Sequence, residues 1–158
     1  MIVILMGVTG SGKTTLGLRL AGDLGWRFSD ADDFRLPTDG DADPAMLLPE
    51  NDSPAARLRS EIEGALARGE NVVLADAALT AEHRKGLKSA FTDVQFVHLK
   101  GDPSLLRRRL RNRSGHFMGN DAMLDQLAVL EEPKDAIAID VDERPGRIVE
   151  RIRDALGI

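Results

Sequence analysis

A glycine-rich segment near the start of the chain carries the residue types that phosphate chemistry requires. It reads Gly7-Val8-Thr9-Gly10-Ser11-Gly12-Lys13-Thr14 and matches the pattern G-x-x-x-x-G-K-[ST]. Glycines let the backbone curl so that its N–H groups, with the start of a following helix, form a fixed anion site. The alternative is a plain glycine-rich turn between a strand and a helix.

Each polar position of this segment has an expected role toward a nucleotide. Lys13 would bring positive charge to the β- and γ-phosphates, Thr14 a hydroxyl to Mg²⁺, and Thr15 a contact to the α-phosphate. We therefore expect ATP and Mg²⁺ as cofactors. The expected nucleotide-binding residues are Gly7, Thr9, Gly10, Ser11, Gly12, Lys13, Thr14 and Thr15.

Carboxylates follow two of the expected strands. Asp30 and Asp32 come directly after the second strand, and Asp76 ends the apolar run at 72–75. A carboxylate at the carboxyl end of a parallel strand can hold the Mg²⁺ shell or accept the proton of an attacking hydroxyl. If the strand continues, Asp30 and Asp32 face the same side. The alternatives are a solvated acidic loop for these two and Asp33, and a helix cap for Asp76.

Arginines cluster between positions 107 and 113. Arg109 and Arg113 are four residues apart and share a helix face, so we expect both as cations of a closing lid. Arg107, Arg108 and Arg111 fit a solvated face better. His116 follows in a glycine-bounded loop, where its pKa permits either a donor or a proton-shuttle role.

Alternating strands and helices must position these residues. We expect strands at 2–6, about 26–29, 72–75, 94–99 and 136–141, and helices at 13–24, 54–69, 80–91, 103–113, 121–130 and 145–157. This order predicts an α/β fold of the P-loop NTPase type, a three-layer αβα sandwich with a parallel five-stranded sheet and a helical lid. We expect one domain over 1–158, with the lid at about 107–125 and a long loop at 33–52.

Composition narrows the classes of function. The 158 residues carry a net charge of −5, which argues against a broad nucleic-acid footprint. The absence of cysteine excludes disulfides, thiolate metal sites and a cysteine nucleophile. No apolar run approaches the roughly 20 residues of a membrane span, and the first residues do not form a signal peptide. We expect a cytoplasmic protein that acts on a small molecule, without nucleic-acid or membrane partners.

Several segments together resemble a known family. They are the phosphate loop, Asp30-Ala31-Asp32, Ala78-Leu79 with Arg84, Leu99-Lys100-Gly101-Asp102, Gly115-His116-Phe117-Met118, and Gln126 with Leu130-Glu131-Glu132-Pro133. In these segments the chain resembles the gluconokinases, small sugar-acid kinases close to the shikimate kinases within the P-loop phosphotransferases.

The resemblance implies a kinase that moves the γ-phosphoryl group of ATP to a hydroxyl of gluconate, giving 6-phosphogluconate. It implies Lys13, Asp32, Arg109 and Arg113 as catalytic residues, with Asp32 at the acceptor hydroxyl. Arg84 and His116 would join the sugar-acid pocket. Thr14 and Asp30 would serve the metal, and Asp76 is a further candidate for that role because of its place after a strand. Related small kinases are often dimers, which leaves a homodimer open.

The departures from the family pattern fall on the acceptor side. Residues 34–37, the segment 48–54 and the stretch Asp76-Ala77-Ala78-Leu79-Thr80 all differ from it. Arg84, with Arg35 second, is the candidate for binding a substrate carboxylate through a bidentate guanidinium. These departures suggest a less anionic sugar or polyol as acceptor. A kinase for another hydroxylated metabolite and a nucleotide-binding module without turnover are further alternatives.

Overall fold

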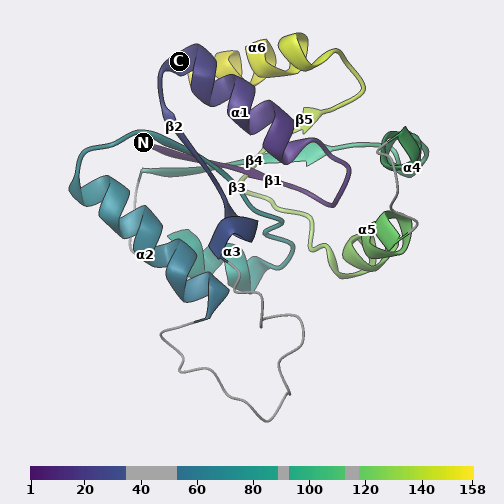
Figure 1. Ribbon diagram of the computed structural model, residues 1–158, viewed down its shortest axis with the longest axis horizontal. Helices are drawn as coiled ribbons and strands as arrows, with labels where there is room; N and C mark the ends of the chain where they lie inside the picture. The colour runs from purple at the N-terminus through teal and green to yellow at the C-terminus, as the bar shows by residue number, and fades with distance from the viewer. Residues whose placement is uncertain (35–52, 89–92, 113–117) are drawn as a thin grey trace.

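The computed structural model describes residues 1–34, 53–88, 93–112 and 118–158 (Figure 1). In chain order its elements are β1 (Ile2–Met6), α1 (Lys13–Leu24), β2 (Arg27–Asp30), the 3₁₀ helix η1 (Ala31–Phe34), α2 (Pro54–Ala67), β3 (Val72–Ala75), α3 (Ala81–Lys88), β4 (Val94–Lys100), α4 (Pro103–Asn112), α5 (Met118–Val129), β5 (Ile137–Asp140) and α6 (Pro145–Leu156). Across the described residues, none of these helices has the length and apolarity to cross a bilayer.

The strands form one parallel sheet in the order β2-β3-β1-β4-β5. β1 lies at its centre because all five of its residues are apolar, and each is 0% exposed. β3 is likewise apolar and buried throughout. Such continuous apolar runs are what a strand covered on both faces requires. The expected α/β fold with a parallel five-stranded sheet is therefore confirmed.

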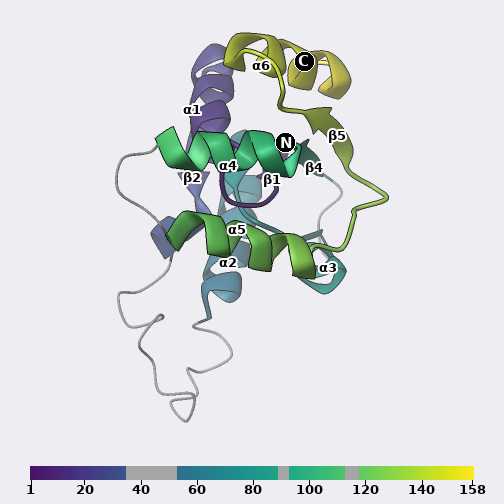
Figure 2. The same ribbon diagram turned by 90° about the vertical axis from the view of Figure 1, so that its right-hand side faces the viewer.

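Helices cover the two faces of this sheet as separate layers, as Figure 1 shows. Leu20 of α1 and Ile152 of α6 belong to the core on one face, and Leu58 of α2 and Leu87 of α3 belong to the core on the other. α4 and α5 lie side by side at one end of the sheet (Figures 1 and 2). α4 joins the first core through Leu105, Leu106 and Leu110, so it is anchored to the body of the domain.

Local sequence signals set several helix ends. Ser53 Oγ accepts a hydrogen bond from Ala56 N (3.1 Å), and Pro54 begins α2. Thr80 Oγ1 accepts one from His83 N (3.2 Å) before α3. Gly25 ends α1 at φ 67°, a left-handed conformation that glycine adopts readily.

The region after β2 differs from expectation. The strand runs over Arg27–Asp30 and does not continue through Asp32, because Ala31–Phe34 turns into a 3₁₀ helix. Asp30 Oδ1 accepts a hydrogen bond from Asp32 N at 3.1 Å, which bends the backbone at that point. The strand alternation that would have put both carboxylates on one side is therefore wrong. Most of the expected 33–52 loop, and the end of the helix expected at 80–91, lie outside the described residues.

Candidate active site

The phosphate loop between β1 and α1 needs glycine for two separate reasons. Gly7 has φ 144°, and a Cβ there would stand 2.8 Å from the carbonyl oxygen of Leu99 in β4. Gly10 has φ 85°, and its Cβ would stand 3.1 Å from Leu110 Cγ in α4. Any larger residue would push the loop away from the sheet and α4, so the sequence pattern here reflects both conformation and space.

Lys13 and Thr14 hold the start of α1 in polar contacts. Lys13 Nζ donates to the carbonyl oxygens of Gly7 (2.9 Å) and Val8 (3.2 Å), which keeps the ammonium over the loop. Thr14 Oγ1 donates to Asp30 Oδ2 at 2.8 Å. A hydroxyl and a carboxylate at this distance are the hard oxygen ligands that Mg²⁺ accepts from a protein when phosphates complete its shell. The structure thus brings together two of the predicted metal residues.

The sheet order explains why these groups meet. β2, β3 and β1 are neighbours, with Asp30 in register with Ala75 and Ala75 in register with Leu5. Their carboxyl ends therefore open into one cleft of about 320 Å³, which we call the strand-end cleft. Its described lining is Thr9, Lys13, Asp30, Ala31, Asp32, Pro54, Ala55, Leu58, Ala75, Asp76, Ala77, Ala78, Leu79, Thr80, His83 and Gln126.

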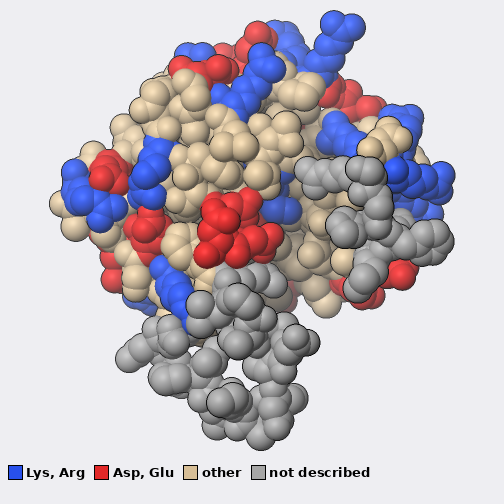
Figure 3. Space-filling model, viewed as in Figure 1, with Lys and Arg blue, Asp and Glu red and all other residues tan. Residues whose placement is uncertain are grey.

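Asp32 lies at the mouth of the strand-end cleft. It belongs to η1, is exposed and lines the cleft together with Asp30. Figure 3 shows an acidic patch at the place that η1 occupies in Figure 1. The 3₁₀ turn, and not a continued strand, is what brings both carboxylates to the same cleft.

Asp76 is buried at the end of β3, and both of its oxygens have partners. Oδ1 accepts from Ala78 N (2.6 Å), and Oδ2 lies 3.2 Å from His83 Nε2. The first bond resembles the cap that was the alternative to a metal role. The hydrogen bond to Asp76 raises the pKa of His83, and desolvation and the charge of Arg84 act in the opposite direction. The sequence analysis did not single out His83, because its partner lies seven residues away across a turn.

Arg84 does not line the strand-end cleft. It is 6% exposed, and its guanidinium donates to the carbonyl oxygens of Ala78 (2.8 Å), Leu79 (3.0 Å) and Glu131 (2.9 Å). These bonds tie the β3–α3 turn to the segment that follows α5. The substrate role expected for Arg84 was argued from its guanidinium, which in this structure is directed at backbone carbonyls.

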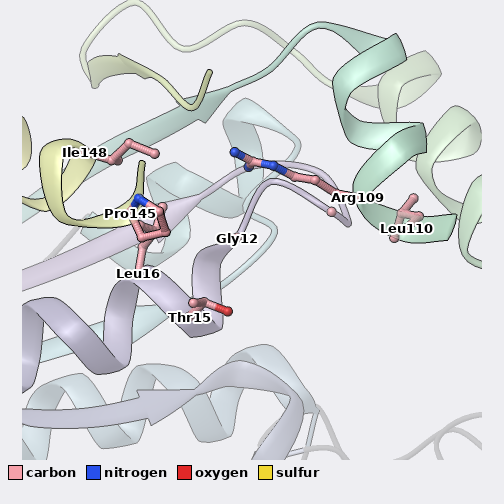
Figure 4. A pocket seen from close by; sticks show the side chains of 8 residues that line it. Gly12, Thr15, Leu16, Arg109, Leu110, Pro145 and Ile148 are labelled. Atoms are coloured by element: carbon pink, nitrogen blue, oxygen red, sulfur yellow. The ribbon is translucent and has the colours of Figure 1, made fainter. Parts of the chain in front are cut away.

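A second pocket lies on the other side of the phosphate loop, between α4 and α6, and has a volume of about 330 Å³. Figure 4 shows Arg109 reaching from α4 across the loop, with Pro145 and Ile148 of α6 opposite. Arg109 donates to the carbonyl oxygen of Val141. The remaining described lining is Gly10, Gly12, Thr15, Leu16 and Leu110, so the walls are largely apolar with one cation.

Gln126 connects α5 to the phosphate loop. Its Oε1 accepts a hydrogen bond from Thr9 N at 2.6 Å. The sequence analysis quoted Gln126 only as part of a family pattern, and no local signal links it to a residue 117 positions away. Ser11, also expected at the nucleotide, is fully buried, and its Oγ has no hydrogen-bond partner in the described structure. Arg113 and His116 lie outside the described residues.

Comparison with known proteins shows which families this chain resembles. A family model described as "AAA domain" matches residues 2–137. The probable gluconokinase of Xenopus tropicalis is 37% identical over 96% of this chain and 91% of its own length, and the gluconokinase of Gluconobacter oxydans is 31% identical over 95% and 88%.

Solved structures of kinases are also similar to this chain. A sugar kinase from Janibacter sp. HTCC2649 is 31% identical with a TM-score of 0.84, over 99% of this chain and 94% of that one. A gluconokinase from Sinorhizobium meliloti 1021 is 29% identical with a TM-score of 0.73, over 98% and 94%. Shikimate kinase from Aquifex aeolicus, 18% identical with a TM-score of 0.60 over 99% and 96%, shares the fold. On the strength of these relatives and its phosphate loop, the chain belongs to the gluconokinase family.

Proposed function

We propose that this protein is a gluconokinase that transfers the γ-phosphoryl group of ATP to a hydroxyl of gluconate and yields 6-phosphogluconate. The observation that carries this proposal is the position of the phosphate loop between two pockets of different chemistry. Gly10, Gly12 and Thr15 line the α4–α6 pocket, whereas Thr9 and Lys13 line the strand-end cleft. A phosphoryl group bound on the loop would have the nucleotide that donates it on one side and the hydroxyl compound that accepts it on the other.

The α4–α6 pocket suits the base of the nucleotide. Leu16, Pro145 and Ile148 offer apolar contact, and the planar guanidinium of Arg109 can stack on an aromatic ring. The phosphates would then follow the loop toward Lys13. In this proposal Arg109 contacts the base, which differs from the role expected from the sequence, a lid cation for the transferring phosphoryl group.

Thr14 and Asp30 would hold Mg²⁺, either directly or through water. The ion would neutralise charge on the β- and γ-phosphates and so lower the cost of transfer. The expected part that Asp76 plays at the metal has less support, since its two oxygens bond Ala78 N and His83.

The transfer step needs a base near the acceptor hydroxyl. The acceptor oxygen forms a bond to the γ-phosphorus, and the bond from that phosphorus to the β,γ-bridging oxygen breaks, leaving ADP. Asp32 would take the hydroxyl proton, because it lines the cleft and is exposed to a bound acceptor. Lys13 would stabilise the charge that spreads over the transferred oxygens.

A neutral polyol is the second candidate acceptor. It is favoured by the three carboxylates of the strand-end cleft, Asp30, Asp32 and Asp76, which would oppose a sugar acid. The cytoplasmic location, the dimeric state and the roles of Arg113 and His116 stay predictions.

An ADP-release assay tests the proposal. Purified protein with ATP and Mg²⁺ is supplied with gluconate, other sugar acids, neutral sugars, polyols or shikimate. Gluconate-dependent ADP release with formation of 6-phosphogluconate is expected. A preference for a neutral polyol would favour the second candidate. ATP binding without turnover on any acceptor would contradict both and indicate a nucleotide-binding module.

A further inference from the structure

The turn between β3 and α3 is held in an unusual conformation. Ala78 has φ 45°, in the left-handed region that residues other than glycine seldom adopt. Its N–H donates to Asp76 Oδ1 (2.6 Å), and its carbonyl oxygen accepts from Arg84 Nη1 (2.8 Å). The next residue is also tied down, because Glu131 N donates to the carbonyl oxygen of Leu79 (2.9 Å). Backbone of this kind persists only where surrounding contacts fix it, and such sites often carry function.

This turn fixes the position of His83. Its backbone N–H donates to Thr80 Oγ1 (3.2 Å), and its Nε2 lies 3.2 Å from Asp76 Oδ2. The side chain is 30% exposed and lines the strand-end cleft. No hydrogen bond to Nδ1 occurs within the described part of the chain, so Nδ1 is the ring nitrogen left for a ligand.

The described lining of the strand-end cleft has few basic side chains that can bind a sugar acid. Lys13 stands at its phosphate-loop end. Arg84 is not among the lining residues, and its guanidinium donates to backbone carbonyl oxygens. Among the described lining residues, His83 is the basic side chain that does not belong to the loop. An acceptor that reaches Asp32 with one hydroxyl would meet His83 along the same cleft.

We propose that His83, oriented by Asp76, binds the phosphoryl acceptor through Nδ1 and so helps to decide which acceptors the enzyme selects. Asp76 acts through His83 and is a positioning residue. The proposal rests on the proposed function, since it takes gluconate as the acceptor. It assigns the histidine–aspartate pair to substrate selection rather than to the metal.

The first test is the kinetic split in His83→Gln. We expect the KM for gluconate to rise about 10-fold to 100-fold, as for loss of one hydrogen bond to a charged group, with the KM for ATP unchanged within about 2-fold. Lys85→Gln is the matched control, because Lys85 is exposed on the same helix and does not line the cleft. Equal KM values for gluconate in wild type and His83→Gln would overturn the proposal.

The second test examines Asp76. In Asp76→Asn the side-chain oxygen can still accept from Ala78 N, but the amide would donate toward His83 Nε2 and reverse its hydrogen-bonding role. The KM for gluconate should rise in this variant and rise no further when His83→Gln is added. Additive effects of the two substitutions would contradict a positioning role. Thermal unfolding of each variant shows whether the fold is kept.

The third test separates this proposal from the proposed function. In protein with ¹³C-labelled histidine, the Cε1–H signal of His83, assigned with His83→Gln, is followed during gluconate titration without ATP. A saturable shift of this signal supports binding at His83. The buried His98 serves as the internal reference. If wild type shows no turnover of gluconate, the proposed function fails, and an unmoved His83 signal then overturns the present proposal as well.

Discussion

Gly17 is the point at which α1 comes very close to β2. The residue is buried, and a Cβ built on it would stand 2.4 Å from Cε2 and 3.1 Å from Cδ2 of Phe28. Gly17→Ala gains about 1 kcal/mol of helix propensity. It must also displace the aromatic ring, and overpacking of this kind costs about 1–3 kcal/mol. We therefore expect the free energy of unfolding to fall by about 0–2 kcal/mol.

Gly22→Ala in the same helix is the matched control. Gly22 is exposed, and no atom lies within 4 Å of its built Cβ. This variant keeps the helix-propensity gain of about 1 kcal/mol without the clash. Urea unfolding, followed by the fluorescence of Trp26, the single tryptophan, measures the free energy of unfolding of both variants. The m-value should stay unchanged, so that a shift in the midpoint reports a change in stability. Adding Phe28→Leu to Gly17→Ala should recover the loss, because it removes the ring atoms.

The same contact reaches the active site. β2 ends in Asp30, which accepts the hydrogen bond of Thr14 at the start of α1. A shift of Phe28 should therefore raise the Mg²⁺ concentration needed for half-maximal activity in Gly17→Ala and not in Gly22→Ala. An equal rise in stability for both variants would refute the reasoning, since it would mean that the ring moves aside at no cost.

Four further predictions follow from the described contacts. Lys13→Ala should lower kcat by at least about 100-fold with little change in unfolding, because Lys13 contacts the loop and not the core; unchanged kcat in the ADP assay would contradict the phosphate site. Asp32→Asn should lower kcat more than ATP affinity, which steady-state kinetics with ATP titration can separate. Arg84→Lys should lower the free energy of unfolding by about 3 kcal/mol in urea, because one ammonium nitrogen cannot occupy the positions of both Nη1 and Nη2, which together reach the three carbonyl oxygens. In histidine NMR titrations, the hydrogen bond to Asp76 should place the pKa of His83 above about 6.5, and burial should place the pKa of His98 below about 6.5. The stability that protonated His83 contributes is then lost as pH rises through the pKa of His83 in the folded state. The stability that neutral His98 contributes is lost as pH falls through the pKa of His98 in the folded state.

The helices and strands whose bounds the sequence predicted best are those whose ends are set by one local feature. β1, α1 and β3 have the expected bounds because continuous apolar runs and the glycine at position 25 define them. The start of α2 at Pro54 followed from its cap. β2 was displaced by one residue, since Arg27–Asp30 at the sheet edge has no buried run to mark it. α5 begins at Met118 and not near Asp121, in a stretch without a clear capping signal.

The site was predictable where the residues of one short motif determine the local conformation. The phosphate loop belongs to that group. Thr14 and Asp30 were both expected at the metal, but the hydrogen bond between them depends on β2 ending beside the start of α1. Arg84, Gln126 and His83 could not be placed, because their hydrogen-bond partners are fixed by the tertiary fold, up to 117 residues away along the chain. The family resemblance and the bidentate geometry of a guanidinium suggested a substrate ligand at Arg84. In the folded chain this guanidinium donates to three backbone carbonyl oxygens, two of them in the β3–α3 turn.

The segment from Gln126 to Glu131 has a thermodynamic consequence. At one end it accepts the N–H of Thr9 in the phosphate loop, and at the other Glu131 bonds Leu79 and Ala81 beside the strand-end cleft. A displacement of this segment on ligand binding would change hydrogen bonds at both places, and the two binding equilibria would then share one free-energy term. Linkage then requires reciprocity: whatever factor bound nucleotide adds to acceptor affinity, bound acceptor must add to nucleotide affinity.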